Sequence, residues 1–326
     1  MTTAWVTLAT TDGYAIGALV LAQSLRNVQT THKLHVLCTT DVSVDMREQL
    51  KKSFDEVTEV NVMDSYDAEN LALIDRPDLG VTFTKLHCWR LTQYSKCVFL
   101  DADTFVLKNS DELFDHPEIS AAPDIGWPDY FNSGVFVFVP SQLTYQNLVQ
   151  FALNEGSFDG GDQGLLNKYF HWWRSADVRH RLSFNYNVTA GVIYSYLAAI
   201  KRHAADIKII HFLGKDKPWH SNASAGFSVV SHHLAQWQKA YEEAVQSGLP
   251  ASLYAVSAVK KQITKKTLPI IECQLMDMAP NNSSILQSSG PNIGEQRYEA
   301  WELGKPDYKG QDAFENIQKV IERSLQ

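Results

Sequence analysis

The segment Phe99-Leu100-Asp101-Ala102-Asp103 constrains the fold of this chain most, because an apolar strand ends there on two carboxylates one residue apart. Cys97 to Leu100 is typical of a buried parallel strand, and ligand sites in open α/β sheets lie at the carboxyl ends of such strands. Alternate residues of an extended segment share a face, so Asp101 and Asp103 are predicted to bind one hard divalent cation with its diphosphate. A D-x-D pattern also occurs by chance in surface loops or as a cap, and that alternative stays open here.

Two further groups of polar residues favour the functional interpretation. Phe158 to Gly164 contains two aspartates and a glutamine, and His211 follows the apolar run Ile207 to Ile210. Three strand or loop ends are then predicted to bring ligands to one crevice.

Strands and helices alternate along the chain, which predicts an α/β, Rossmann-like fold with a mostly parallel, doubly wound sheet. The first strand, loop and helix are typical of a nucleotide-binding unit, although no GxGxxG or Walker lysine motif is present. Asp162 is predicted to be the N-cap of the helix Gly164–Phe170, so a structural role is the alternative to a role in the site. The expected strands are Val6–Ala9, Lys33–Cys38, Val57–Val62, Val98–Leu100 and Asn132–Val139, and the expected helices are Ala15–Leu25, Met46–Phe54, Val81–Tyr94, Gln142–Leu153 and Gly164–Phe170.

Composition excludes several classes of partner. The formal net charge is −8 and no basic run is present, which argues against nucleic acid or an anionic membrane as partner. The chain starts without the charged and apolar regions of a signal peptide, and no apolar run reaches membrane length. Four cysteines without CxxC spacing indicate reduced thiols, so a cytoplasmic protein is expected. The glycan-acceptor pattern Asn187-Val188-Thr189 is then expected to be unused.

The pattern divides the chain into three parts. Residues 1–262 are predicted to form the catalytic domain, and 263–293 to be a linker of flexible, Pro-, Asn- and Ser-rich composition. Residues 294–326 are aromatic and helical again. Within that tail motif, one helical face carries Phe314, Ile317, Val320, Ile321 and Leu325.

The candidate cation site has a third ligand in His211. Two carboxylates, a neutral imidazole, a diphosphate and water suit Mn²⁺ or Mg²⁺, and the imidazole favours Mn²⁺. A packed core histidine is the alternative for His211. Lys217 is expected to supply positive charge to a departing phosphate, or else to be a solvated lysine.

Five segments together resemble the glycogenin family, within glycosyltransferase family 8, over nearly the whole chain. They are Phe83–Trp89, Leu100–Thr104, Phe131–Phe136, Gly156–Gly164 and His211–Gly214. The resemblance implies a single transferase domain of the GT-A type and a homodimer. It implies a retaining enzyme that takes glucose from UDP-glucose, attaches it to its own tyrosine and extends it by α-1,4 linkages. The tail is implied to bind glycogen synthase.

The same resemblance assigns residues. The acceptor is implied to be Tyr194, which the residues alone do not distinguish from Tyr196 or Tyr186. Thr11 stands where the family is expected to have asparagine. The implied uridine and ribose contacts are Leu8, Thr10, Thr11 and Tyr14; the other nucleotide contacts are Arg76, Ala102, Asn132, Ser133, Gly214 and Lys217; the sugar contacts are Lys85, Asp159, Asp162 and Gln163.

The sequence leaves alternatives open for the reaction mechanism and for the functional class of the protein. Retention needs either a covalent sugar on Asp162 or Gln163, or attack from the face that the diphosphate leaves. A transferase with another sugar acceptor, such as a galactosyltransferase, is a same-fold alternative, and Tyr194 argues against it. A non-catalytic scaffold is the alternative of a different class, and the intact ligand set Asp101, Asp103, His211 and Asp162 argues against that.

Overall fold

The computed structural model describes residues 2–189, 198, 202–220 and 231–246, all within one compact unit. Tyr194, Cys273, the predicted linker 263–293 and the tail motif 294–326 lie outside the described residues.

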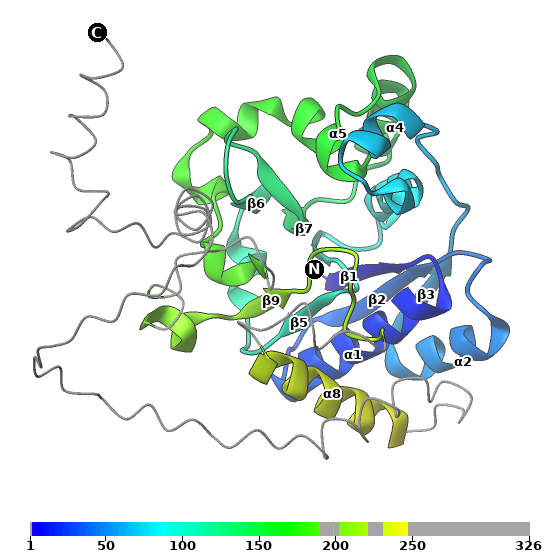
Figure 1. Ribbon diagram of the computed structural model, residues 1–326, viewed down its shortest axis with the longest axis vertical. Coiled ribbons are helices and arrows are strands. Elements are labelled where there is room, and N and C mark those ends of the chain that lie inside the picture. The colour runs from blue at the N-terminus through cyan, green and yellow to red at the C-terminus, as the bar shows by residue number, and fades with distance from the viewer. Residues whose placement is uncertain (1, 190–197, 199–201, 221–230, 247–326) are drawn as a thin grey trace, which may run out of the picture. The chain divides into compact units, whose positions relative to one another are not determined.

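The larger sheet has six strands in the order β3-β2-β1-β4-β7-β6 (Figure 1). β1 (Thr3–Ala9), β2 (Lys33–Cys38), β3 (Glu56–Glu59) and β4 (Lys96–Leu100) pair in parallel. β7 (Phe131–Phe138) and β6 (Ser120–Pro123) add an antiparallel edge. The strand order reverses at β1, with β2 on one side and β4 on the other. The crevice beyond the carboxyl ends of β1 and β4 is therefore the place where such sheets bind ligands.

A smaller sheet, in the order β5-β9-β8, stands beside that crevice. β5 (Thr104–Val106) follows β4 after three residues, β9 (Ile209–His211) pairs with it antiparallel, and β8 (Val188–Thr189) pairs with β9 in parallel. This pairing carries His211 to the end of β4.

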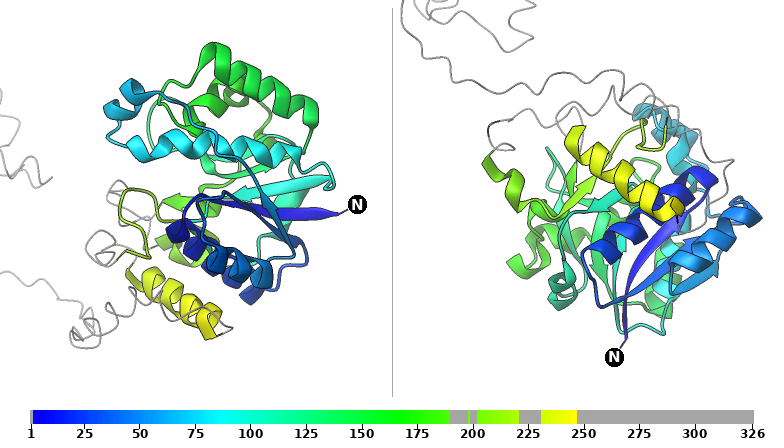
Figure 2. Two further views of the ribbon diagram at one scale, coloured as in Figure 1. Left: turned by 90° about the vertical axis from the view of Figure 1, so that its right-hand side faces the viewer. Right: turned by 90° about the horizontal axis from the view of Figure 1, so that it is seen from below.

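Helices cover both faces of the larger sheet (Figure 2). One layer contains α1 (Asp12–Asn27), α2 (Val44–Ser53) and α8 (Ser231–Gln246), and the other contains η1 (Pro77–Arg90), α4 (Gln142–Glu155) and α5 (Asp162–Tyr169). The shorter elements are α3 (Ala68–Leu73), η2 (Asp111–Asp115), η3 (His171–Ser175), η4 (Val178–His180), η5 (Phe184–Tyr186) and η6 (Ala204–Asp206).

The strand period of two explains why both faces are apolar. Within β4, Val98 and Leu100 belong to the core that includes α1, whereas Cys97 and Phe99 belong to the core that includes η1 and α5. A strand buried on both faces has no polar position until it ends, so the first carboxylate after it marks the edge of the sheet.

The α/β fold class and the mainly parallel sheet are confirmed, with small shifts at the ends of elements. The helix predicted at Val81–Tyr94 is wrong in type, because Pro77–Arg90 forms 3₁₀ turns instead. Two threonine hydroxyls bond to backbone there, Thr82 to Leu79 O at 2.6 Å and Thr84 to Met63 N at 2.9 Å. The local bond from Thr82 competes with the regular α-helical pattern, whereas the Thr84 bond ties the segment to a neighbouring part of the chain.

The predicted cap of α5 is also wrong. Gly161 is the N-cap residue, Asp162 is the first residue of the helix, and Asp159 Oδ1 accepts the Gly161 and Gly164 amides at 2.9 and 3.1 Å. Asp162 makes no such cap because its carboxylate pairs with a lysine in the crevice.

One expectation from composition is met within the described residues. Cys38, Cys88 and Cys97 are buried free thiols. No helix in the described part of the chain is long and apolar enough to cross a membrane.

Candidate active site

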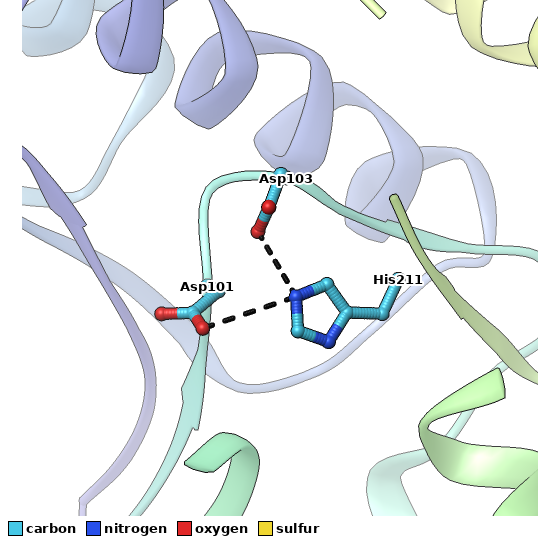
Figure 3. Close-up of side chains that lie close together, drawn as sticks. All are labelled: Asp101, Asp103 and His211. Carbon is cyan, nitrogen blue, oxygen red and sulfur yellow. Dashed lines mark ion pairs between the residues drawn. The ribbon is translucent and has the colours of Figure 1, made fainter. Parts of the chain in front are cut away.

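Asp101 and Asp103 lie in a tight turn between β4 and β5. The Thr104 amide and hydroxyl both donate to Asp101 O, at 2.9 and 2.7 Å, and the Asp101 amide donates to Gly134 O at 2.8 Å. These bonds correct the expected extended conformation of the D-x-D segment. Both carboxylates nevertheless face the same imidazole, as Figure 3 shows.

The two aspartates and His211 form a compact cluster. His211 Nε2 lies 3.3 Å from Asp103 Oδ1 and 4.0 Å from Asp101 Oδ2. One ligand atom from each of the three residues lies within 4.8 Å of the others. Two carboxylates and one imidazole are donors that suit a divalent cation, so the residues fit the predicted metal site. His211 is buried, with 2% of its surface exposed, but its Nε2 faces the two carboxylates. It is therefore part of the polar cluster and not a histidine packed in an apolar core.

Two lysines offset the charge of these carboxylates. Lys85 Nζ lies 2.9 Å from Asp101 Oδ1, and Lys217 Nζ lies 2.5 Å from Asp103 Oδ2. Burial raises the pKa of Asp101, although Lys85 beside it acts in the opposite direction. Burial alone would also raise the pKa of Asp103, but Lys217 and His211 outweigh it and hold that pKa well below its ordinary range.

Lys85 joins the cation cluster to the start of α5. Besides Asp101, its ammonium contacts Asp162 Oδ2 at 2.5 Å and donates to Ser133 O at 3.2 Å. Burial by itself lowers the pKa of Lys85, but the two carboxylates outweigh it and raise that pKa above its ordinary value. Lys85 is therefore a permanent cation between two carboxylates.

Gln163 is held at both ends of its amide. Its Nε2 donates to Asp124 Oδ2 at 2.5 Å, and its Oε1 accepts the Ser133 amide at 3.2 Å. The Asp162 amide next to it donates to Thr82 Oγ1 at 3.0 Å. The polar end of α5 is thus fixed by the Asp124 side chain just after β6, by the backbone of β7 and by the Thr82 side chain of η1.

A cavity of about 730 Å³ brings these groups together. Most residues that the sequence predicted for the site line it: Leu8, Thr10, Tyr14, Arg76, Lys85, Asp101, Ala102, Asp103, Asn132, Ser133, Asp159, Asp162, Gln163, His211, Gly214 and Lys217.

Two predicted residues are not among them. Thr11 is not a lining residue, because its hydroxyl caps α1 by accepting the Tyr14 amide at 3.4 Å. Tyr194 lies outside the described residues.

Sequence reasoning missed several residues of this cavity. Asp124 directly follows β6, so the rule that found Asp101 at a strand end could have found it. Thr82 and Thr189 also line the cavity, and no sequence signal marks them. Asn187, which bonds His211, carried only a glycan-acceptor pattern.

Comparison with known proteins agrees with this geometry. The sequence profile described as Glycosyl transferase family 8 matches residues 5–118 and 115–223. The chain is 60% identical over 241 residues to Glycogenin-1 of Caenorhabditis elegans, which covers 74% of this chain and 56% of that protein. It is 46% identical to Glycogenin-1 of Oryctolagus cuniculus over 334 residues, which covers 99% of both chains.

Solved structures support the fold alone. The apo structure of the WbbM bifunctional glycosyltransferase matches with a TM-score of 0.54 and 20% identity over 80% of this chain and 52% of that one. The apo form of the glycosyltransferase GlyE of Streptococcus pneumoniae matches with a TM-score of 0.52 and 20% identity over 76% and 64%. The sequence matches to the family profile and to both glycogenins show that the chain belongs to glycosyltransferase family 8 and, within it, to the glycogenin family.

Proposed function

We propose that this enzyme transfers glucose from UDP-glucose, with retention, first to its own Tyr194 and then to the growing glucan through α-1,4 linkages. As a glycogenin-family glycosyltransferase, the chain is a self-glucosylating initiator of glycogen synthesis. The observation that carries the proposal is the single cavity in which the Asp101, Asp103 and His211 cluster meets Lys85, Asp162 and Gln163.

The cavity offers distinct surfaces to the parts of the donor. Leu8, Thr10 and Tyr14 would form the wall for uracil and ribose. Burial raises the pKa of the Tyr14 phenol, and nearby Asp103 adds to this, so the phenol stays neutral and able to donate a hydrogen bond. Arg76 and Lys217 would face the phosphates.

The divalent cation is proposed to be Mn²⁺, with Mg²⁺ as substitute, held by Asp101, Asp103 and His211. When bound, it supplies positive charge that offsets the charge gained by the UDP leaving group. The imidazole ligand favours Mn²⁺ over Mg²⁺.

The sugar would lie against Lys85, Asp159, Asp162 and Gln163. In this arrangement Asp162 is paired with Lys85 and both ends of the Gln163 amide are bonded. Both candidate nucleophiles of a covalent route thus already have partners, and we propose instead attack from the face that the diphosphate leaves. A phosphate oxygen of UDP would then accept the proton of the tyrosine phenol, whose unperturbed pKa is about 10.

Partners and location follow from the sequence. The tail motif 294–326 is proposed to bind glycogen synthase, with 263–293 as a linker between it and the catalytic domain 1–262. The match over 99% of both chains to rabbit Glycogenin-1 supports this organisation. A homodimer and a cytoplasmic location are proposed too, and the buried free thiols Cys38, Cys88 and Cys97 support the second.

Peptide mapping tests the donor and the acceptor together. Purified protein is incubated with Mn²⁺ and UDP-glucose, UDP-galactose or UDP-N-acetylglucosamine, digested, and searched for modified peptides. Hexose on the peptide that contains Tyr194, formed fastest with UDP-glucose, is the expected result. Modification only of an added saccharide acceptor would instead indicate the same-fold alternative.

A further inference from the structure

Two buried asparagines link His211 to the backbone of β7. His211 Nδ1 lies 2.9 Å from Asn187 Oδ1, and Asn187 Nδ2 donates to Asn132 Oδ1 at 2.8 Å. The Gly134 amide donates to the same Asn132 oxygen at 2.9 Å. His211, Asn187 and Asn132 are 2%, 1% and 3% exposed, so water does not compete for these bonds.

The direction of this chain of bonds is fixed at its backbone end. A backbone N–H only donates, so the Asn132 atom facing Gly134 must be the oxygen. The Asn187 atom facing that oxygen must then be the amide nitrogen, which turns Asn187 Oδ1 toward the imidazole. Because an amide oxygen only accepts, His211 must carry a proton on Nδ1.

A proton on Nδ1 determines the state of the other ring nitrogen, Nε2. Nε2 is the atom that faces Asp103 at 3.3 Å and Asp101 at 4.0 Å. With the proton held on Nδ1, the lone pair of a neutral His211 is on Nε2 and points into the cation site.

Gly134 contributes space as well as its amide. A Cβ at this position would lie 2.3 Å from His211 Cε1 and 2.6 Å from Nδ1, closer than such atoms can approach. The imidazole ring thus packs directly against the backbone of β7 at Gly134. This contact gives a physical reason for the glycine in Asn132-Ser133-Gly134.

We propose that Asn187, oriented through Asn132 by the Gly134 amide, is a positioning residue that fixes the tautomer and orientation of His211 for binding the divalent cation. The proposal rests on His211 being a ligand, as proposed above. It also removes Asn187 as a glycan acceptor in the folded protein, because both polar atoms of its amide are bonded and buried.

The first test uses the unaltered full-length protein. With ¹⁵N-labelled histidine, diamagnetic Mg²⁺ and UDP, the His211 ring signals are identified by their absence in His211→Gln. A protonated Nδ1, and an Nε2 that is unprotonated and shifts when Mg²⁺ is added, are expected. A proton on Nε2 with a metal-responsive ring would overturn the role of Asn187 but leave His211 as a ligand. A ring that does not respond to Mg²⁺ would overturn the ligand assignment, and this proposal with it.

The second test compares two buried asparagines. Asn187→Leu is expected to weaken Mn²⁺ binding in the presence of UDP by about 10- to 100-fold, the usual effect of removing a partner of a metal-bound histidine. Asn167→Leu is the matched control, because Asn167 is 3% exposed and bonds Phe131 and Gln163 backbone but not His211. Its Mn²⁺ affinity should stay within about threefold of wild type. Equal Mn²⁺ affinities in the two variants, measured by electron paramagnetic resonance titration, would contradict the proposal.

Discussion

Lys217 and Asp103 form an ion pair inside the protein, with Nζ 2.5 Å from Oδ2 and side chains only 5% and 7% exposed. The same carboxylate faces His211 through its other oxygen. Asp103 therefore serves the proposed cation site and neutralises a buried lysine at once. The sequence predicts that Lys217 faces a departing phosphate. In this structure its ammonium is paired with the Asp103 carboxylate.

This double role predicts that Asp103→Asn costs both activity and stability. Removing one partner of a buried ion pair leaves an uncompensated charge, so the free energy of unfolding should fall by about 3 kcal/mol. Adding Lys217→Met should restore much of that stability without restoring transfer. Urea unfolding and UDP-glucose turnover measure the two effects. Transfer at the wild-type rate in Asp103→Asn would contradict the assignment of Asp103 to the cation site.

Asp162→Asn should slow both the first glucosylation and later extension, by about 10²- to 10³-fold in kcat, because the charge beside Lys85 acts on the donor sugar in every cycle. Initial rates onto the protein itself and onto an added maltoside measure the two steps. The control is Asp177→Asn, an exposed aspartate that pairs with Arg179 in the described part of the chain and does not line the cavity, which should retain full activity. A defect confined to the first glucosylation would mean that Asp162 serves the tyrosine acceptor only.

The protein should become less stable as the pH is lowered, because of His35. Burial lowers the pKa of His35 from 6.5 to about 4, and the ring bonds the Tyr94 hydroxyl at 3.0 Å and Thr58 Oγ1 at 2.9 Å. The unfolded chain therefore binds this proton first, so the free energy of unfolding should drop by about 3 kcal/mol from pH 7 to pH 4 through this group. Below pH 4 both states hold the proton and the effect stops growing. His35→Gln should lack this part of the decline in urea unfolding, and an identical pH profile would refute the assignment.

The tail motif should matter for partner binding only. Deleting 295–326 is expected to leave self-glucosylation near normal and to abolish capture of glycogen synthase, and Phe314→Ala with Ile317→Ala should do the same. The apolar face of the predicted tail helix is expected to need a partner, because an isolated helix of about 13 residues is marginal in water. Synthase capture that is unchanged by the deletion would reject the assignment, as would a deletion that unfolds the catalytic domain.

Sequence reasoning succeeded where chemistry follows directly from a strand end. Asp101 and His211 were singled out because each ends an apolar run. Asp101 follows β4 of the larger sheet, and β9 of the smaller sheet pairs with β5 and brings His211 close to Asp101. The N-cap prediction failed at Asp162, because the capping rule does not include its contact to Lys85, 77 positions earlier in the chain, which no local pattern encodes. Asn187 was missed for the same reason, since its partners lie on β7 and β9. The assignment of Tyr194 came from family resemblance, because nothing in its neighbourhood distinguishes one tyrosine from the next.

The central claim is that this chain glucosylates its own Tyr194 with a donor bound at the Asp101, Asp103 and His211 cluster. Intact-mass spectrometry of full-length protein before and after addition of UDP-glucose and Mn²⁺ tests it most directly. Wild type is predicted to gain a ladder of hexose additions, whereas Tyr194→Phe is predicted to gain none and still to glucosylate an added maltoside. An unchanged ladder on Tyr194→Phe, or no ladder on wild type, would contradict the account.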